Sequence, residues 1–156
     1  MRPKIDKDLF TFSNQWRVRF YEADIQGIVH HAEMIRYFEI GRVEYWRHLG
    51  IGYQEFRKSG YEYVVARVEC DYLKPLQFDM VITMMVRIAK FTRTSSTYEY
   101  LILDDQGQPA VFGSTMLVCV RTGGSRPHPI PDEYFKRILA YEKPGSVEYK
   151  PPKNGD

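Results

Sequence analysis

Two groups that could act together in acyl chemistry lie close in the sequence between Val18 and Gly50. The carboxylate of Asp24 follows a strand-like run, residues 16–21, and precedes a long helical pattern that opens at His30 and His31. The start of a helix offers free backbone N–H groups and the positive end of the helix dipole. A carboxylate beside such a helix start suits a reaction in which one group supplies a base or nucleophile and the other stabilises an oxyanion.

The periodicity of the apolar residues predicts the elements that must position these groups. Residues 31–49 carry one apolar stripe at helical spacing, and Gly50 suits the left-handed position after a helix. Gly41 lies inside this stripe, so we expect another backbone to approach it closely. After a short helix expected at 54–58, the period changes to two in four strand-like runs. A last helix is expected at 132–140. The stripe consists of Met34, Phe38, Gly41, Tyr45 and Leu49.

The order of these elements is strand, long helix and four antiparallel strands, which indicates an α+β domain. A helix with one apolar stripe has to lie across the apolar face of the sheet. Residues 104–107 predict a hairpin turn between the last two strands. We expect a single domain over residues 1–156, with an ordered core at about 13–141 and a mobile arm and tail on either side.

The charge balance and the distribution of apolar residues exclude several classes of protein. There are 22 Lys and Arg residues against 20 Asp and Glu, a net charge of +2, which does not favour nucleic acid as the main partner. The first ten residues are too polar for a signal peptide, and no apolar run could cross a membrane. Cys70 and Cys119 fall in strand-like runs and are expected to be buried, reduced thiols. These features predict a cytoplasmic protein.

The segment from Arg17 to Arg42 resembles the signature of the 4-hydroxybenzoyl-CoA thioesterase family, the hotdog-fold acyl-CoA thioesterases. Ala23, Glu33 and Met34 depart from the family pattern, and the last two lie near the expected pocket, where they bear on acyl-group preference. The resemblance implies a hotdog fold, a five-stranded antiparallel sheet wrapped around a long central helix. The matching residues are Arg17, Val18, Tyr21, Glu22, Asp24, Gly27, Val29, His30, His31, Ala32, Tyr37, Phe38, Glu39 and Arg42.

The resemblance also implies an activity: hydrolysis of an acyl-CoA thioester to a free carboxylate and CoA, with no cofactor. Asp24 matches the family's catalytic carboxylate, which is a general base in some members and a nucleophile in others. His31 matches the position whose backbone amide polarises the thioester carbonyl. Seven further residues are expected to contact the substrate, the last three through the CoA phosphates: Gly27, Val29, His30, Met34, Lys90, Arg93 and Arg126.

Ordinary structural roles compete with these assignments. Aspartate is common in turns, which is an alternative for Asp24. The helix start has no Ser, Thr, Asp or Asn as N-cap, so its first N–H groups are left for water or for a substrate oxygen. Neighbouring His30 and His31 should point in different directions, which disfavours a metal site. Four other charges are expected to form structural pairs or solvated surface, with Glu39 and Arg42 paired at i, i+3: Glu22, Glu39, Arg42 and Glu44.

An acyl-CoA-binding or sensing protein without turnover is the alternative function, because a fold does not determine a function. A hotdog dehydratase is a third possibility, and it would need a histidine and a carboxylate in a different arrangement. Release of free thiol from acyl-CoA separates the thioesterase from both. In the family, exposed edge strands pair across a two-fold axis, so the resemblance implies a homodimer or homotetramer with active sites at the interface.

Overall fold

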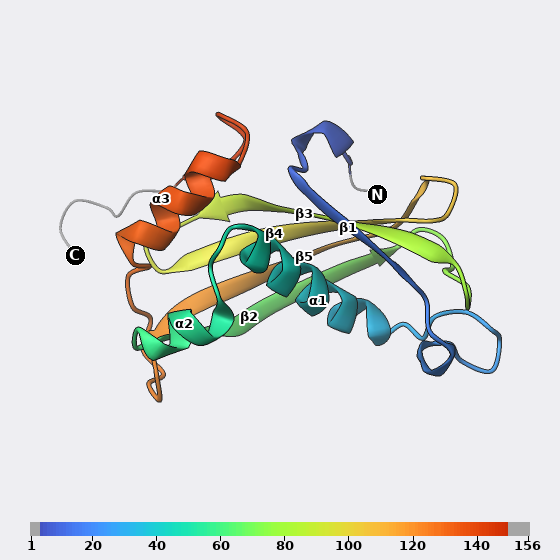
Figure 1. Cartoon of the computed structure of the whole chain (residues 1–156), viewed down its shortest axis with the longest axis horizontal. Coiled ribbons are helices and arrows are strands. Elements are labelled where there is room, and N and C mark those ends of the chain that lie inside the picture. Colours follow the sequence, from blue (N-terminus) through green and yellow to red (C-terminus); the bar gives the residue numbers. More distant parts are fainter. Residues whose placement is uncertain (1–3, 150–156) are drawn as a thin grey trace.

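The computed structural model describes residues 4–149 and consists of one curved antiparallel sheet with a long helix across one face (Figure 1). This arrangement confirms the predicted α+β class. The elements in chain order are η1 (Lys7–Leu9), β1 (Phe12–Arg17), η2 (Phe20–Glu22), α1 (Glu33–His48), α2 (Tyr53–Lys58), β2 (Tyr61–Tyr72), β3 (Val81–Phe91), β4 (Ser95–Leu103), β5 (Pro109–Arg121), α3 (Asp132–Tyr141) and β6 (Glu148–Tyr149).

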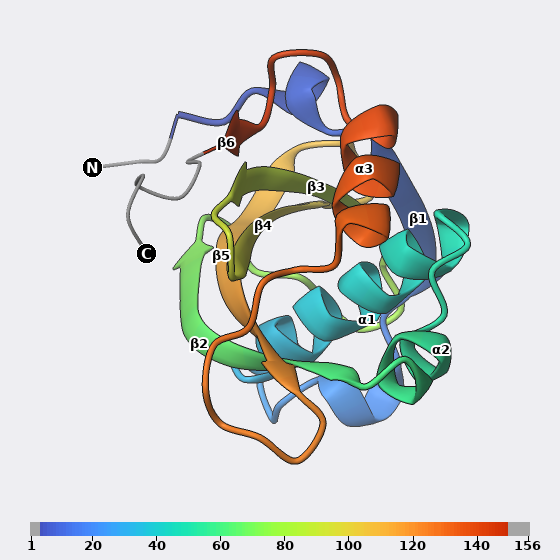
Figure 2. The same ribbon diagram turned by 90° about the vertical axis from the view of Figure 1, so that its left-hand side faces the viewer.

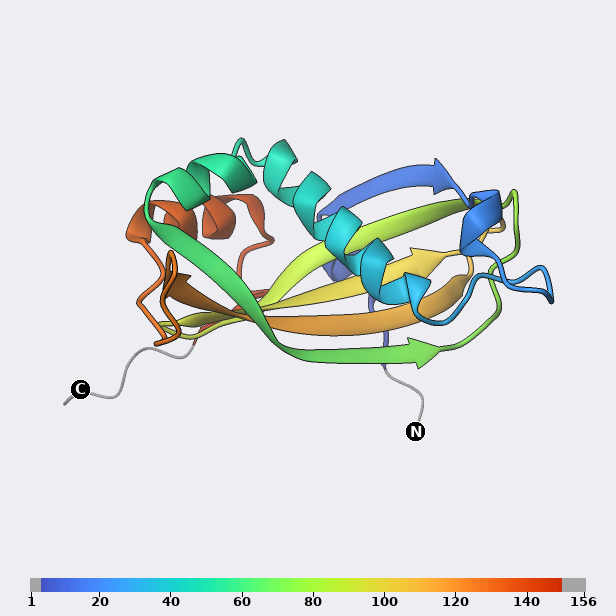
Figure 3. The same cartoon turned by 90° about the horizontal axis from the view of Figure 1, so that it is seen from below.

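The five long strands run in the spatial order β1-β3-β4-β5-β2, and every neighbouring pair among them is antiparallel. The short strand β6 pairs in parallel with the end of β3. Viewed along the sheet, the strands curl around α1, with β1 and β2 at the two edges (Figure 2). The long helix therefore lies in the concave face, as the apolar stripe predicted (Figure 3).

Close contacts between α1 and the sheet depend on two glycines. The ring of Phe38 stacks on Tyr100, with ring centroids 4.6 Å apart, and lies over Gly113. A Cβ at Gly113 would lie 2.3 Å from Phe38 Cζ, so no larger residue fits. A Cβ at Gly41 would lie 2.8 Å from Met84 Cγ. The expectation that a backbone approaches Gly41 was therefore wrong, because side chains of β3 fill that space instead.

The chain ends carry more structure than the sequence pattern predicted. The first strand begins at Phe12 and ends at Arg17, whereas the pattern placed it at residues 16–21. Structure extends beyond the expected core of 13–141, because Lys7–Leu9 form a 3-10 turn and Glu148–Tyr149 pair with β3. The remainder of the expected tail, from residue 150, lies outside the described residues.

The two cysteines are both free, with Cys119 buried and Cys70 half-buried. Burial raises the pKa of the Cys119 thiol to about 11, so this thiol stays protonated at neutral pH. No helix within residues 4–149 is long and apolar enough to cross a membrane.

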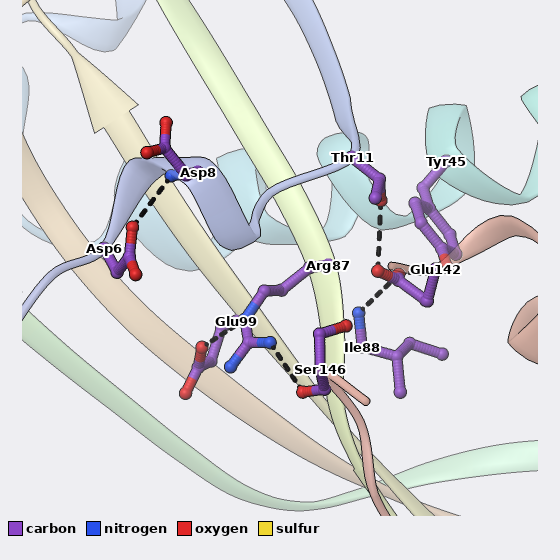
Figure 4. A network of polar contacts seen from close by, with 9 residues as sticks. All are labelled: Asp6, Asp8, Thr11, Tyr45, Arg87, Ile88, Glu99, Glu142 and Ser146. Carbon is purple, nitrogen blue, oxygen red and sulfur yellow. Dashed lines mark hydrogen bonds and ion pairs between the residues drawn. The ribbon is translucent and has the colours of Figure 1, made fainter. Parts of the chain in front are cut away.

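A buried carboxylate, Glu142, fastens the end of α3 to the body of the domain (Figure 4). Its side chain accepts hydrogen bonds from the Tyr45 hydroxyl at 2.6 Å, the Ile88 N–H at 2.9 Å and the Thr11 hydroxyl at 3.1 Å. Nearby, Arg87 pairs with Glu99 and also donates to the Ser146 carbonyl. Glu142 therefore joins the N-terminal segment, the central helix and β3 at one point.

Replacing Glu142 by glutamine should flatten the dependence of stability on pH. Burial raises the pKa of Glu142 above its usual range, despite the hydrogen bonds and the Arg87 charge that lower it. Between the unfolded and folded pKa values the folded chain binds more protons, so the free energy of unfolding falls as the pH rises from about 4 through the raised pKa. Urea unfolding across this range should show the wild type losing stability relative to Glu142→Gln.

Two further variants serve as controls for this measurement. The glutamine Oε1 can still accept from Tyr45 and Ile88, and its amide can donate to Thr11, so Glu142→Gln should fold. Glu142→Ala leaves buried donors unpaired and should cost about 1–3 kcal/mol for each. Glu133→Gln changes an exposed carboxylate on the same helix. If the free energy of unfolding changes with pH in parallel for the wild type and Glu142→Gln, the raised pKa of Glu142 is contradicted.

Candidate functional site

The connection between β1 and α1 forms a narrow loop at one end of the molecule (Figure 1). Ala23 and Val29 form an isolated antiparallel bridge, and the Asp24 N–H donates to the Ile28 carbonyl at 2.8 Å. Gly27 at the tip has a φ of 75°, and a Cβ there would meet nothing within 4 Å. Its role is therefore conformational. The Val29 N–H donates to Leu76 at 2.7 Å, so the loop is braced by the segment before β3.

The Asp24 side chain is half-buried and starts a tight turn. Its Oδ1 accepts the Gln26 N–H at 2.8 Å, and its carbonyl accepts the Gly27 N–H at 2.9 Å. Asp24 thus has the turn role that competed with the catalytic one, yet no described residue donates to Oδ2. The next residue, Ile25, is 102% exposed, so this end of the loop faces solvent within one chain.

The start of α1 retains one backbone donor without an acceptor. The Glu33 N–H donates to the His30 carbonyl and the Met34 N–H to the His31 carbonyl. The Ala32 N–H donates to His30 Nδ1 at 3.2 Å, while Ala32, the N-cap residue, has no capping side chain, as the sequence indicated. Within residues 4–149 nothing accepts the His31 N–H. This donor is the one that the family resemblance assigned to the thioester carbonyl.

The two histidine rings lie against each other on the surface. Their centroids are 4.2 Å apart, so the expectation that His30 and His31 point in different directions was wrong. In the described part of the chain, no three His, Cys, Asp or Glu side chains are grouped so as to hold a metal ion.

A buried glutamate connects the Asp24 loop to α1 through a partner that the sequence did not specify. Glu22 is only 4% exposed, and its Oε2 accepts from the Tyr37 hydroxyl and from the Arg19 N–H, both at 2.7 Å. Burial and the Glu22 carboxylate raise the pKa of Tyr37 well above its usual range. Of the two roles expected from the sequence, a structural pair or a solvated surface charge, Glu22 has the structural one, and it ties the segment before Asp24 to the helix.

Tyr72, at the end of β2, is a second contact that the sequence did not indicate. Its hydroxyl donates to the His31 carbonyl at 2.9 Å, which ties the helix start to the edge strand. Val29 and Met34 lie beside this junction but are 6% and 3% exposed, in the hydrophobic core. Their expected contact with an acyl group stays a prediction.

The three basic residues expected on the CoA phosphates lie at the other end of the sheet. β3 begins beside Arg17, close to the Asp24 loop, and Lys90 comes nine residues later. At about 3.3 Å per residue, this places Lys90 roughly 30 Å along the sheet. Lys90 pairs with Glu148 at 3.3 Å, and Arg126 lies in the exposed loop after β5. One chain therefore does not bring these residues to Asp24.

Comparison with known proteins gives a family match. A family model described as the Thioesterase-like superfamily matches residues 18–138. The Escherichia coli O6:H1 protein named Acyl-CoA thioester hydrolase YbgC is 24% identical over 119 residues, which is 75% of this chain and 89% of that protein.

Two solved structures share the fold and a similar level of sequence identity. A hypothetical protein from Aquifex aeolicus superposes with a TM-score of 0.77 at 32% identity, covering 81% of this chain and 98% of that one. A thioesterase from Thermus thermophilus, solved with coenzyme A and Zn, gives a TM-score of 0.75 at 30% identity, covering 86% and 96%. The predicted hotdog fold is confirmed, and the chain belongs to the thioesterase-like superfamily.

Proposed function

We propose that this chain hydrolyses acyl-CoA thioesters at the junction of Asp24 and the start of α1. The observation that carries the proposal is the His31 N–H without an acceptor, at the start of a 16-residue helix, on a loop where Asp24 Oδ2 is also unused. The E. coli relative is named as an acyl-CoA thioester hydrolase, and the Thermus structure contains coenzyme A. Both are consistent with this substrate class.

The proposed reaction uses each group once. The thioester carbonyl oxygen accepts from the His31 N–H, which stabilises negative charge as the carbonyl carbon becomes tetrahedral. Asp24 takes a proton from the attacking water, the C–S bond breaks, and the CoA thiolate leaves and is protonated. The products are a carboxylic acid, ionised at neutral pH, and CoA. Direct attack by Asp24 on the thioester carbonyl is the other route: it expels the CoA thiolate and forms a mixed anhydride, which water then cleaves. Water attack at the Asp24 carbonyl carbon of that anhydride would leave labelled oxygen in the Asp24 carboxylate after one turnover.

The exposed edge of β2 supports a homo-oligomer. β2 is a 12-residue edge strand, and its Val64 and Val65 side chains are 46% and 53% exposed. Such an edge is a template for pairing with another strand. Antiparallel pairing with β2 of a second copy would bring the partner's Tyr61 end beside the first copy's Tyr72 end, which is next to His31.

This pairing would also explain how the distant basic residues serve the site. The loop after β5 starts beside the Tyr61 end, since the Thr122 N–H donates to the Gly60 carbonyl at 3.0 Å. A second copy would therefore carry its Arg126 loop to the Asp24 end of the first. In this proposal, CoA phosphates are held by the neighbouring chain.

Asp24→Asn should lower kcat by at least about 10²-fold, because it removes the only proposed proton acceptor. The asparagine Oδ1 can still accept the Gln26 N–H, so the loop and the melting temperature should be preserved. Asp79→Asn is the matched control, an exposed aspartate whose φ of 67° asparagine tolerates. Thiol release from a panel of acyl-CoAs gives the readout, and Asp24→Asn turnover within a few-fold of wild type would refute the site.

The chain should be at least a dimer at micromolar concentration, because pairing covers the exposed β2 edge. Light scattering coupled to size exclusion measures the molar mass directly. Val64→Lys, which puts a charge on that edge, should weaken assembly. A stable wild-type monomer at micromolar concentration would exclude the proposed assembly.

Arg126→Ala should raise KM for acyl-CoA and leave kcat nearly unchanged, which is the signature of lost uniform binding. Lys136→Ala, an exposed change on α3, is the control. Mixing Asp24→Asn chains with Arg126→Ala chains tests whether Arg126 acts across the interface. If Arg126 acts across the interface, a hybrid dimer has one site that combines Asp24 of one chain with Arg126 of the other. That site is intact and should have the wild-type KM. If the KM of the mixture stays as high as that of Arg126→Ala, Arg126 does not act from the partner.

A further inference from the structure

Three glutamate–arginine pairs at i, i+3 spacing lie along α1, and the middle one is broken. The first and last form ion pairs, and the first measures 3.1 Å. Arg42 instead donates through Nη1 to the Tyr100 hydroxyl at 3.2 Å and to the Thr115 hydroxyl at 3.4 Å. The predicted Glu39–Arg42 pair was therefore wrong. The three pairs are Glu33–Arg36, Glu39–Arg42 and Glu44–Arg47.

Arg42 and Glu39 both line a cavity of about 320 Å³ between α1, α2 and the β2–β5 edge of the sheet. Glu39 is at the exposed rim, while Arg42 is half-buried. The rest of the lining is aromatic or aliphatic. The lining residues are Glu39, Arg42, Val43, Trp46, Tyr53, Tyr63, Val65 and Leu117.

The charge of Arg42 has no counter-ion in the part of the chain that the structure describes. Its two acceptors are neutral hydroxyls, which also bond each other at 2.7 Å. Its Nε and Nη2 donate to no described residue. A half-buried guanidinium with free donors and no carboxylate partner favours a ligand that brings an anionic oxygen, and arginine binds carboxylates with two parallel hydrogen bonds.

The cavity lies along the helix from the proposed reaction centre. Arg42 is nine residues beyond Glu33, about 14 Å at 1.5 Å per residue. Ile35, Glu39, Arg42 and Trp46 follow at i, i+4, i+7 and i+11, so they share one flank of α1. An acyl group that extends from the helix start along this flank reaches the cavity with its distal end.

We propose that this cavity receives the distal end of the acyl group and that Arg42 selects acyl groups ending in a carboxylate. The inference rests on the proposed thioesterase function and adds a substrate class to it. The apolar walls bind the chain or ring, and the guanidinium binds the terminal oxygens. The Glu39 carboxylate at the rim repels the terminal carboxylate of such an acyl group, so Glu39→Gln should strengthen the preference.

The test compares two substrates of equal chain length, octanedioyl-CoA and octanoyl-CoA, by kcat/KM. The wild type should prefer the carboxylate-terminated substrate by at least tenfold, Arg42→Met should lose the preference, and Arg42→Lys should retain part of it. Arg42→Met leaves Tyr100 and Thr115 bonded to each other, so it should fold and assemble normally. Arg47→Met, on the same helix but outside the cavity, should behave as wild type. A folded Arg42→Met variant with the wild-type ratio overturns the proposal.

A binding measurement separates this proposal from the proposed hydrolysis. The chain has two tryptophans, so Trp16→Phe leaves Trp46, in the cavity wall, as the only indole. Octanoate should quench its fluorescence at a concentration at least tenfold lower than octan-1-ol does, and Arg42→Met should abolish the difference. Equal affinity for acid and alcohol overturns the cavity assignment. Failure to release thiol from any acyl-CoA, with this binding preserved, overturns only the hydrolysis.

Discussion

The hydrogen bond between Tyr37 and the buried Glu22 is the contact on which the geometry of the candidate site depends. It joins the last turn before Asp24 to the second turn of α1, and the same Glu22 oxygen also accepts the Arg19 N–H. Trp16 packs edge-on against Tyr37 with ring centroids 5.2 Å apart, which keeps water away. Losing one such buried partner costs about 1–3 kcal/mol. The loop is therefore fixed to the helix whose first amide it flanks.

The position of that helix depends in turn on its seat in the sheet. Phe38 can lie over the sheet only because Gly113 has no side chain, and Gly41 admits the side chains of β3. These contacts seat α1 on the sheet, and the cavity beside Arg42 lies between the same helix and the β2 edge. This cavity and the exposed helix start with His31 are two ends of one flank of that helix.

The periodicity of the sequence was sufficient for the helix, the four strands after it and the buried stripe from Met34 to Tyr45, because these depend on local spacing. The periodicity does not predict contacts that join segments far apart in the sequence. Tyr72 reaches His31 over 41 positions. Side-chain direction was also missed, since Arg42 and Arg36 occupy equivalent spacings but only one faces the sheet. The family resemblance implied the roles of Asp24 and His31, which stay predictions, whereas the separation of Lys90 from Asp24 follows only from strand order.

Glu142 has a consequence for the order in which the chain acquires its structure during synthesis. It accepts from Thr11, 131 positions earlier, and Tyr141 donates to the Thr11 carbonyl. The start of β1, an edge strand, is thus secured by residues that leave the ribosome only after all five long strands. Closing so long a loop is slow, and an unsecured edge strand can pair with other chains. Until α3 is made, the growing chain exposes the strand that leads to its own candidate site.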